Sequence, residues 1–178
     1  MSMLIARSLL ALATALAPPT AAAADPTPPK CAEAASAATL PANLAAWPRR
    51  APVATAAAPG GIDTADIALG AAVDAELLPA GSVTYAIHPE KPGVPTGSGG
   101  LLRLNLAEAG TYRVVLGARA WIDIVSAGQL VPSVGHAEGP ACSGIRKLVD
   151  FTLVPGIYVL QLSGSDAAVA GLLVVKLP

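Results

Sequence analysis

From Ile62 onward, short runs of alternating hydrophobic and polar residues are separated by glycine and proline. Such runs are typical of β-strands, because successive side chains of a strand point to opposite faces of its sheet. No stretch in this region repeats apolar residues over three helical turns. The pattern predicts about eight strands: Ala72–Leu78, Ser82–His88, Leu101–Leu106, Thr111–Leu116, Ala120–Ser126, Lys147–Leu153, Ile157–Leu162 and Val169–Leu177.

The close spacing of these strands predicts the class of fold. Antiparallel strands need only tight turns, whereas parallel strands need long crossover connections. We therefore predict an all-β fold, a single antiparallel β-sandwich or jelly-roll-like domain over residues 62–178. The run Gly171–Leu177 is apolar on both faces, which indicates a central strand that is covered on both sides.

One pattern occurs twice in this region. Around Gly110–Tyr112 and again around Gly156–Tyr158, a strand ends and a glycine leads into the next strand as Gly-x-Tyr. Glycine permits a positive φ at such a turn, and tyrosine can bury its ring while its hydroxyl stays near the edge. These elements resemble those of bacterial pre-peptidase C-terminal domains and similar sandwich domains. The resemblance implies a sandwich fold and carries no active site with it.

The N-terminal segment, residues 1–24, has the pattern of a secretory signal peptide. It holds one basic residue, Arg7, then the apolar run Leu9–Ala17, then the small residues Ala21–Ala24. The apolar run is about half as long as a bilayer-spanning helix needs to be. We therefore expect cleavage before Asp25, no transmembrane segment after cleavage, and a mature protein that is periplasmic or secreted.

Residues 25–61 have a different composition, with 13 alanines and 7 prolines among 37 residues. Alanine buries little surface and proline removes a backbone donor, so this composition cannot build a core of its own. We predict an Ala/Pro-rich extension that is tethered to the sandwich. Within it, Leu40–Trp47 carries two leucines and a tryptophan, which is enough for a short docked turn.

The two cysteines, Cys31 and Cys142, both follow the expected cleavage point. An even number of cysteines in an exported chain favours a disulfide. A Cys31–Cys142 disulfide would tie the extension to the sandwich; the alternative is that Cys142 is a buried thiol. Only in its reduced form could Cys142 act as a nucleophile beside a histidine.

Composition also narrows the class of partner. The chain has 11 basic and 12 acidic residues, and aromatic residues make up 3% of it. Proteins that bind nucleic acids usually carry an excess of basic residues, and aromatic side chains that stack on bases. We therefore expect no nucleic-acid partner, and an unknown protein or a small ligand instead.

The only two histidines lie in two His-x-Glu triplets, His88-Pro-Glu90 and His136-Ala-Glu138. In an extended segment, residues two apart point the same way, so each triplet can present an imidazole and a carboxylate together. If the triplets met in space, their nitrogen and oxygen ligands would suit iron, zinc or copper. The alternative is that all four side chains simply face solvent beside their Pro/Gly-rich turns.

Three segments, Pro89–Gly93, Ala120–Asp123 and Gly139–Phe151, resemble parts of a group of small exported bacterial proteins. Some members of this group are labelled homogentisate 1,2-dioxygenase. The dioxygenase family holds iron through two histidines and a glutamate, so the resemblance implies a metal-dependent oxidoreductase as one alternative. The histidines of this chain do not have the spacing of that family.

Together these observations predict a non-catalytic, exported β-sandwich protein without a cofactor. Its role would be to bind a ligand or to act in the cell envelope. The alternative is a small metal-binding protein, or a metal-dependent oxidoreductase, with one divalent metal held by His88 and His136 together with Glu90 and Glu138.

Overall fold

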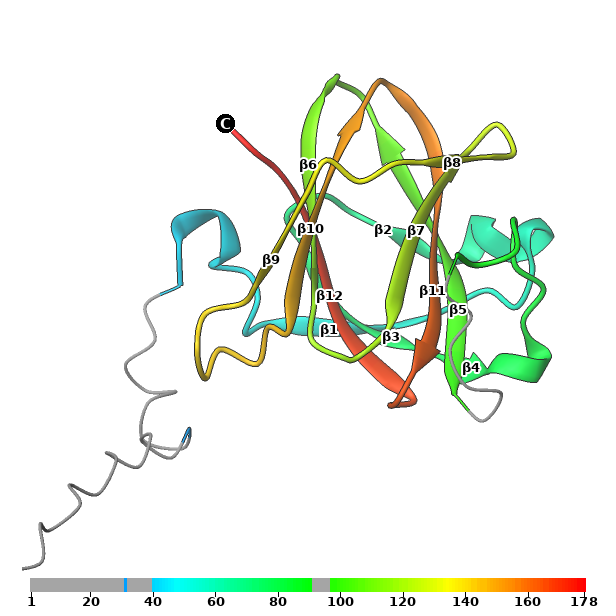
Figure 1. Ribbon diagram of the computed structural model, residues 1–178, viewed down its shortest axis with the longest axis horizontal. Coiled ribbons are helices and arrows are strands. Elements are labelled where there is room, and N and C mark those ends of the chain that lie inside the picture. Colours follow the sequence, from blue (N-terminus) through cyan, green and yellow to red (C-terminus); the bar gives the residue numbers. More distant parts are fainter. Residues whose placement is uncertain (1–30, 32–39, 91–96) are drawn as a thin grey trace, which may run out of the picture.

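The computed structural model describes Cys31 and residues 40–90 and 97–178. The expected signal peptide, residues 1–24, lies outside the described residues. Two mixed sheets pack against each other as an all-β sandwich (Figure 1). Sheet A has the order β1 (Arg50–Ala54), β3 (Ala72–Glu76), β12 (Val169–Lys176), β6 (Gly110–Leu116), β10 (Lys147–Leu153), β9 (Gly135–Glu138). Sheet B has the order β2 (Asp66–Ile67), β5 (Ser98–Leu106), β11 (Gly156–Ser165), β7 (Trp121–Ser126), β8 (Gln129–Val131), with β4 (Leu78–Pro79) also paired to β5.

Most of the strands expected from alternation are present, and the predicted all-β sandwich is confirmed. The strands β3, β5, β6, β7, β10, β11 and β12 occupy seven of the eight predicted runs. The described chain also has three short 3-10 helices: η1 (Ala42–Leu44) precedes β1, η2 (Pro59–Thr64) lies between β1 and β2, and η3 (Ala80–Ser82) lies between β4 and β5.

The predicted strand Ser82–His88 is wrong. Helix η3 ends at Ser82, and residues 83–90 run in irregular conformation against sheet B. The backbone of Ile87 is held by one side chain instead of a strand, because Gln161 of β11 accepts from its N–H (3.5 Å) and donates to its carbonyl (3.0 Å). The alternating apolar residues of this segment therefore pack on a sheet without joining one.

The sheets are mixed because two edge strands pair in parallel. β1 pairs with β3 and β2 pairs with β5 in parallel, whereas the other strand pairs of both sheets are antiparallel. Between β1 and β2 the chain crosses from sheet A to sheet B, where Ala56 and Leu101 exchange backbone hydrogen bonds. β1 lies within residues 25–61, so part of the Ala/Pro-rich segment belongs to sheet A. Backbone pairing needs no large side chain, and an edge strand tolerates Pro52.

The main core lies between the two sheets and takes alternate residues from their facing sides. It continues under η2 and under residues 83–90 at the β5 side. Its central side chains are almost wholly buried: Leu102, Leu104, Leu106, Tyr112, Val114, Leu116, Ile122, Ile124, Leu160, Leu162, Leu172 and Val174. The alternation read from the sequence thus corresponds to the face of each strand that points into the main core.

A second cluster of buried side chains, the outer cluster, covers the opposite face of sheet A. Leu44 of η1 and Trp47 pack onto β6, β10 and β12, together with Ile145 from the loop before β10. The cluster consists of Leu44, Trp47, Ala72, Val115, Ile145, Leu148, Leu173 and Val175. Strand β12, between β3 and β6, is therefore covered on both faces, which confirms the predicted central strand.

The two Gly-x-Tyr repeats form equivalent corners where the chain passes from one sheet to the other. The Tyr112 hydroxyl donates to the Glu108 carbonyl (2.7 Å), and the Tyr158 hydroxyl donates to the Val154 carbonyl (2.8 Å). Only 1% of Tyr112 and 4% of Tyr158 is exposed, as the repeat predicts. Both corners lie at the top of the sandwich in Figure 1. A tyrosine bonded to the backbone a few residues upstream is also found at corners of immunoglobulin-type sandwiches.

Candidate functional site

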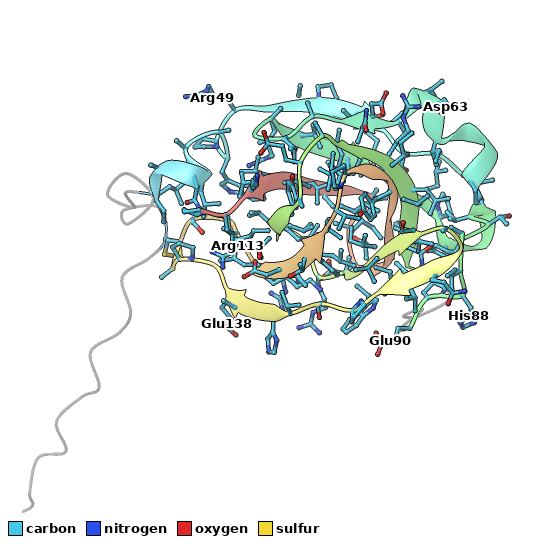
Figure 2. All side chains as sticks on the ribbon, turned by 90° about the horizontal axis from the view of Figure 1, so that it is seen from above. Arg49, Asp63, His88, Glu90, Arg113 and Glu138 are labelled. Atoms are coloured by element: carbon cyan, nitrogen blue, oxygen red, sulfur yellow. A yellow bond between two sulfur atoms is a disulfide. The ribbon has the colours of Figure 1, made fainter. Side chains whose placement is uncertain are left out.

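The two His-x-Glu triplets lie on different parts of the sandwich. His88 and Glu90 belong to residues 83–90 on sheet B, whereas His136 and Glu138 belong to β9, the last strand of sheet A. Figure 2 shows His88 and Glu138 toward opposite ends of the view. Among the described residues, no group of three or more His, Cys, Asp or Glu side chains could hold a metal ion. A metal at these four residues stays a prediction without structural support.

One triplet does line a cavity. A hollow of about 1110 Å³ opens between β9, β10 and the start of β7. The loop between β9 and β10 closes one side of it. Its lining residues are Gly117, Trp121, Ile122, Ser133, His136, Ala137, Glu138, Gly139, Pro140, Ala141, Cys142, Gly144, Ile145, Arg146, Lys147 and Val149.

Strand register directs the triplet on β9 toward the hollow. His136 lies opposite Val149, and Glu138 lies opposite Lys147, on neighbouring antiparallel strands. Residues that are directly opposite share a face of the sheet. Because Val149 packs against the main core, His136 and Glu138 also lie on the face that is turned toward sheet B. His136 and Glu138 thus share one face of β9, and both side chains are exposed.

Trp121 of β7 forms the opposite wall of the hollow. The Lys147 ammonium lies 5.3 Å from the centroid of the indole ring, which is within the range of a cation–π contact. The indole N–H donates to the Asp123 carboxylate at 2.8 Å. The Trp121 ring on sheet B thus contacts Lys147 on sheet A across the hollow.

A buried polar group supports this wall from behind. Asp123 and Gln161 are almost wholly buried on adjacent strands, and the Gln161 amide donates to the Asp123 carboxylate at 3.1 Å. Asp123 in turn accepts from the Trp121 indole, so the three side chains form one connected network. Buried polar networks of this kind fix side-chain orientation. Trp121 and Asp123 are two residues apart on β7, so they share a face of that strand.

The loop that closes the hollow is held by the predicted disulfide and by a tight turn. Cys31 and Cys142 lie at disulfide-bonding distance, with 5.0 Å between their Cα atoms. The Ser143 hydroxyl donates to the Pro140 carbonyl (2.6 Å) and accepts from the Ile145 N–H (3.1 Å). The backbone at Cys142 has a positive φ of 59°, so the turn is tight enough to need a left-handed residue.

Cationic side chains outnumber carboxylates around the hollow. Arg146 and Lys147 line the hollow at the start of β10, and Glu138 is the only carboxylate in the lining. Glu138 lies directly opposite Lys147, so these two charges offset each other. Arg146 is exposed and forms no ion pair with any residue of the described chain. Among the residues that the structure describes, the rim of the hollow therefore carries one guanidinium without an ion-pair partner.

The ion pairs that shift pKa values lie elsewhere on the sandwich. On sheet B, the Arg103 guanidinium holds the pKa of Asp66 below its usual value through a hydrogen bond and through its charge. At the β5–β6 corner, Lys176 lowers the pKa of Glu108 in the same way. Burial raises the pKa of Tyr85, whose hydroxyl has no hydrogen-bond partner in the described part of the chain. None of these groups lines the hollow.

Comparisons with known proteins add no relative to these observations. No protein-family model matches the chain, and no curated protein shows significant similarity to it. In the described part of the chain, no helix is long and apolar enough to cross a membrane. The resemblances stated from sequence motifs therefore remain predictions, and a function has to be argued from the hollow itself.

Proposed function

We propose that this protein is exported and that it binds a small organic ligand, without transforming it, in the hollow beside β9. The hollow carries this proposal, because its volume of about 1110 Å³ suits a small molecule. Ligand sites are typically cavities of a few hundred to about 1,000 Å³, with apolar walls and a few convergent polar groups. Here Trp121, Ile122 and Ile145 supply the apolar walls, and charged groups surround them.

The charges at the rim indicate the chemistry of the ligand. Lys147 is offset by Glu138, which leaves Arg146 as the group that can accept an anionic partner. A guanidinium binds carboxylate oxygens in a paired geometry. The indole of Trp121 offers a flat apolar surface at the other wall. The proposed ligand therefore has an aromatic or apolar body and one carboxylate.

Binding is favoured over turnover by what the reactive side chains of the loop already do. Cys142 lies at disulfide-bonding distance from Cys31, so its thiol is engaged. The Ser143 hydroxyl is engaged on both sides by the turn, because it donates to Pro140 and accepts from Ile145. A nucleophile needs a base within hydrogen-bond reach. The Ser143 hydroxyl is instead bonded to backbone groups of the turn.

Export is supported by the same cysteine pair together with the N-terminal pattern. Disulfides persist in oxidising compartments such as the periplasm and the extracellular space. The segment that precedes Asp25 has the order of charge, apolar run and small residues that signal peptidases recognise. We propose that the ligand is met outside the cytoplasm.

A ligand screen on the exported protein tests this proposal. Thermal-shift assays with aromatic and aliphatic carboxylates, each beside its uncharged amide, should give stabilisation by carboxylates alone. The Arg146→Gln variant should bind a hit roughly tenfold more weakly, because a charge-assisted hydrogen bond is lost. Arg49→Gln is the matched control, since Arg49 is exposed and does not line the hollow. Equal stabilisation by acids and amides, or by neither, would count against the proposal.

A further inference from the structure

We propose that β9 is a self-association edge, through which two copies of this chain pair antiparallel and continue sheet A across a two-fold axis. The inference goes beyond the proposed ligand and does not depend on it. It starts from the position of β9 at the end of sheet A, where β10 is its only strand neighbour in the described chain. In Figure 2, β9 runs along the lower margin of the molecule. An edge strand presents unpaired backbone groups that can template another strand.

The two edges of sheet A differ in their protection. The opposite edge strand, β1, contains Pro52, which lacks an N–H, and Arg50 is held in an ion pair with Asp74 at 2.7 Å. Proline and tied charges are devices that keep edges from pairing. Strand β9 contains no proline, and three of its four residues, His136, Ala137 and Glu138, are exposed. Its backbone is therefore open to an added strand.

The sequence of β9 is complementary to itself in one antiparallel register. If Ala137 of one copy lies opposite Ala137 of the other, each His136 faces the Glu138 of the second copy. The small Ala137 then lies on the two-fold axis, where the copies approach most closely. A carboxylate can accept a hydrogen bond from the N–H of an imidazole that faces it across strands, and the same patch serves both copies, as a two-fold interface requires.

Neighbouring registers lose this complementarity. Shifting the axis to Glu138 would place the two Glu138 carboxylates against each other, and shifting it to His136 would place the two imidazoles against each other. Two carboxylates that face each other across strands repel each other, and two imidazoles that face each other both lose the carboxylate partner. The pattern of imidazole and carboxylate therefore selects the register that is centred on Ala137.

Exposed apolar residues flank this edge. Val134, just before β9, is 61% exposed, and Leu130 on the edge strand β8 is 40% exposed. In the proposed register Val134 lies opposite Pro140 of the second copy, which is also exposed. Large apolar side chains at a rim often mark an interaction surface. The pairing also places the hollows of the two copies side by side.

Analytical ultracentrifugation of the exported protein over a wide concentration range tests the proposal. We expect a reversible monomer–dimer equilibrium. His136→Glu places two carboxylates opposite each other, and Glu138→Lys places a lysine opposite His136. Each single variant should weaken dimerisation roughly tenfold or more, because two symmetric pairs are lost. The double variant His136→Glu/Glu138→Lys restores opposite charges and should dimerise again.

A mixing experiment makes the test specific for the register. The His136→Glu and Glu138→Lys chains carry complementary charges, so an equimolar mixture should form a heterodimer although neither chain dimerises well alone. The other triplet supplies matched controls, since His88→Glu and Glu90→Lys make the same charge changes at exposed residues away from β9. These controls should dimerise like the unchanged protein.

Three results would overturn the proposal. The first is a monomer at every concentration, and the second is dimerisation of both single variants with unchanged affinity. The third is a mixture of the two single variants that stays monomeric. Circular dichroism melts of each variant would verify that the sandwich is intact, so that a loss of dimer is not mistaken for a loss of fold.

Discussion

The main core and the outer cluster cover opposite faces of sheet A, and they are built in different ways. The main core lies between two sheets and draws its side chains from regularly alternating strands. The outer cluster relies on η1, Trp47 and the loop before β10, none of which is a strand. It is held by the Trp47 indole, which donates to the Ser143 carbonyl at 3.0 Å, and by the Cys31–Cys142 pair.

This difference shows how a short, alanine-rich segment can cover the outer face of sheet A. Strand β12 is apolar on both sides, so its outer side chains would face water without a cover. The segment of residues 40–49, here called the arm, supplies three large apolar side chains, Leu40, Leu44 and Trp47, and the cysteine pair keeps the arm near the sheet. The main core should therefore depend on packing, and the outer cluster on tethering as well.

The largest effect is expected from removing the tether. Replacing Cys31 and Cys142 by serine opens a loop with a sequence separation of 111 residues. The chain-entropy argument then predicts a loss of about 4–5 kcal/mol in the free energy of unfolding. Urea denaturation would measure the loss, and Trp47 fluorescence should change more than the signals of Tyr112 and Tyr158. An unchanged unfolding midpoint would show that the arm docks without its tether.

In the main core, Tyr158→Ala should cost about 3–5 kcal/mol, because the ring is buried and leaves a cavity. Tyr158→Phe keeps the ring and removes only the hydrogen bonds to Val154, so it should cost about 1 kcal/mol. Urea denaturation of both variants separates packing from the corner hydrogen bonds. A similar cost for the two variants would show that the hydroxyl, not the ring, stabilises the corner.

In the outer cluster, Leu44→Ala should cost about 2–3 kcal/mol, the lower part of the range for buried leucine. The reason is that η1 is short and can move toward the sheet to fill the space. Leu160→Ala in the main core is the matched comparison and should cost about 4–5 kcal/mol, because two sheets restrict its surroundings. If Leu44→Ala costs as much as Leu160→Ala, the two regions are equally rigid.

The smallest effect is expected from an exposed ion pair outside both clusters. Arg103 of β5 bonds to Asp66 of β2, and it lowers the pKa of that carboxyl. Because the folded pKa lies below the unfolded value, this pair stabilises the fold above about pH 4, and the stabilisation is lost as the pH falls through the folded pKa. The urea unfolding midpoint should fall at low pH, and Asp66→Asn should remove the part of this fall that comes from the Arg103–Asp66 pair. Exposed pairs contribute little, so the change should be small.

Much of the fold could be predicted because alternation is a local signal. In β5, β6 and β11, the face that points into the main core is visible as a period of two in the sequence. The Gly-x-Tyr corners were predictable for a similar reason, since glycine, tyrosine and the bonded carbonyl lie within a few residues. The Cys31–Cys142 pair could be predicted because the sequence has only two cysteines.

The candidate site was predicted only in part. Strand β9 was not among the predicted strands, but the spacing of two indicated that His136 and Glu138 would share a face if their segment were extended, as it is. It could not show that His88 and Glu90 lie on the other sheet, since that depends on which distant strands become neighbours. Trp121 was missed as a wall of the hollow because a half-buried tryptophan in a strand has the same pattern as a core residue.

By itself, then, the sequence determined most of the longer strands, the faces of those strands that enter the main core, and where the chain turns between sheets. These properties follow from the side-chain period of a strand and from the φ preferences of glycine and proline. Only the tertiary structure decided that β1 joins sheet A in parallel, that residues 83–90 stay irregular, and that the hollow forms beside β9. Each of these depends on backbone groups that find partners far away in the chain, and backbone groups are the same in every residue except proline.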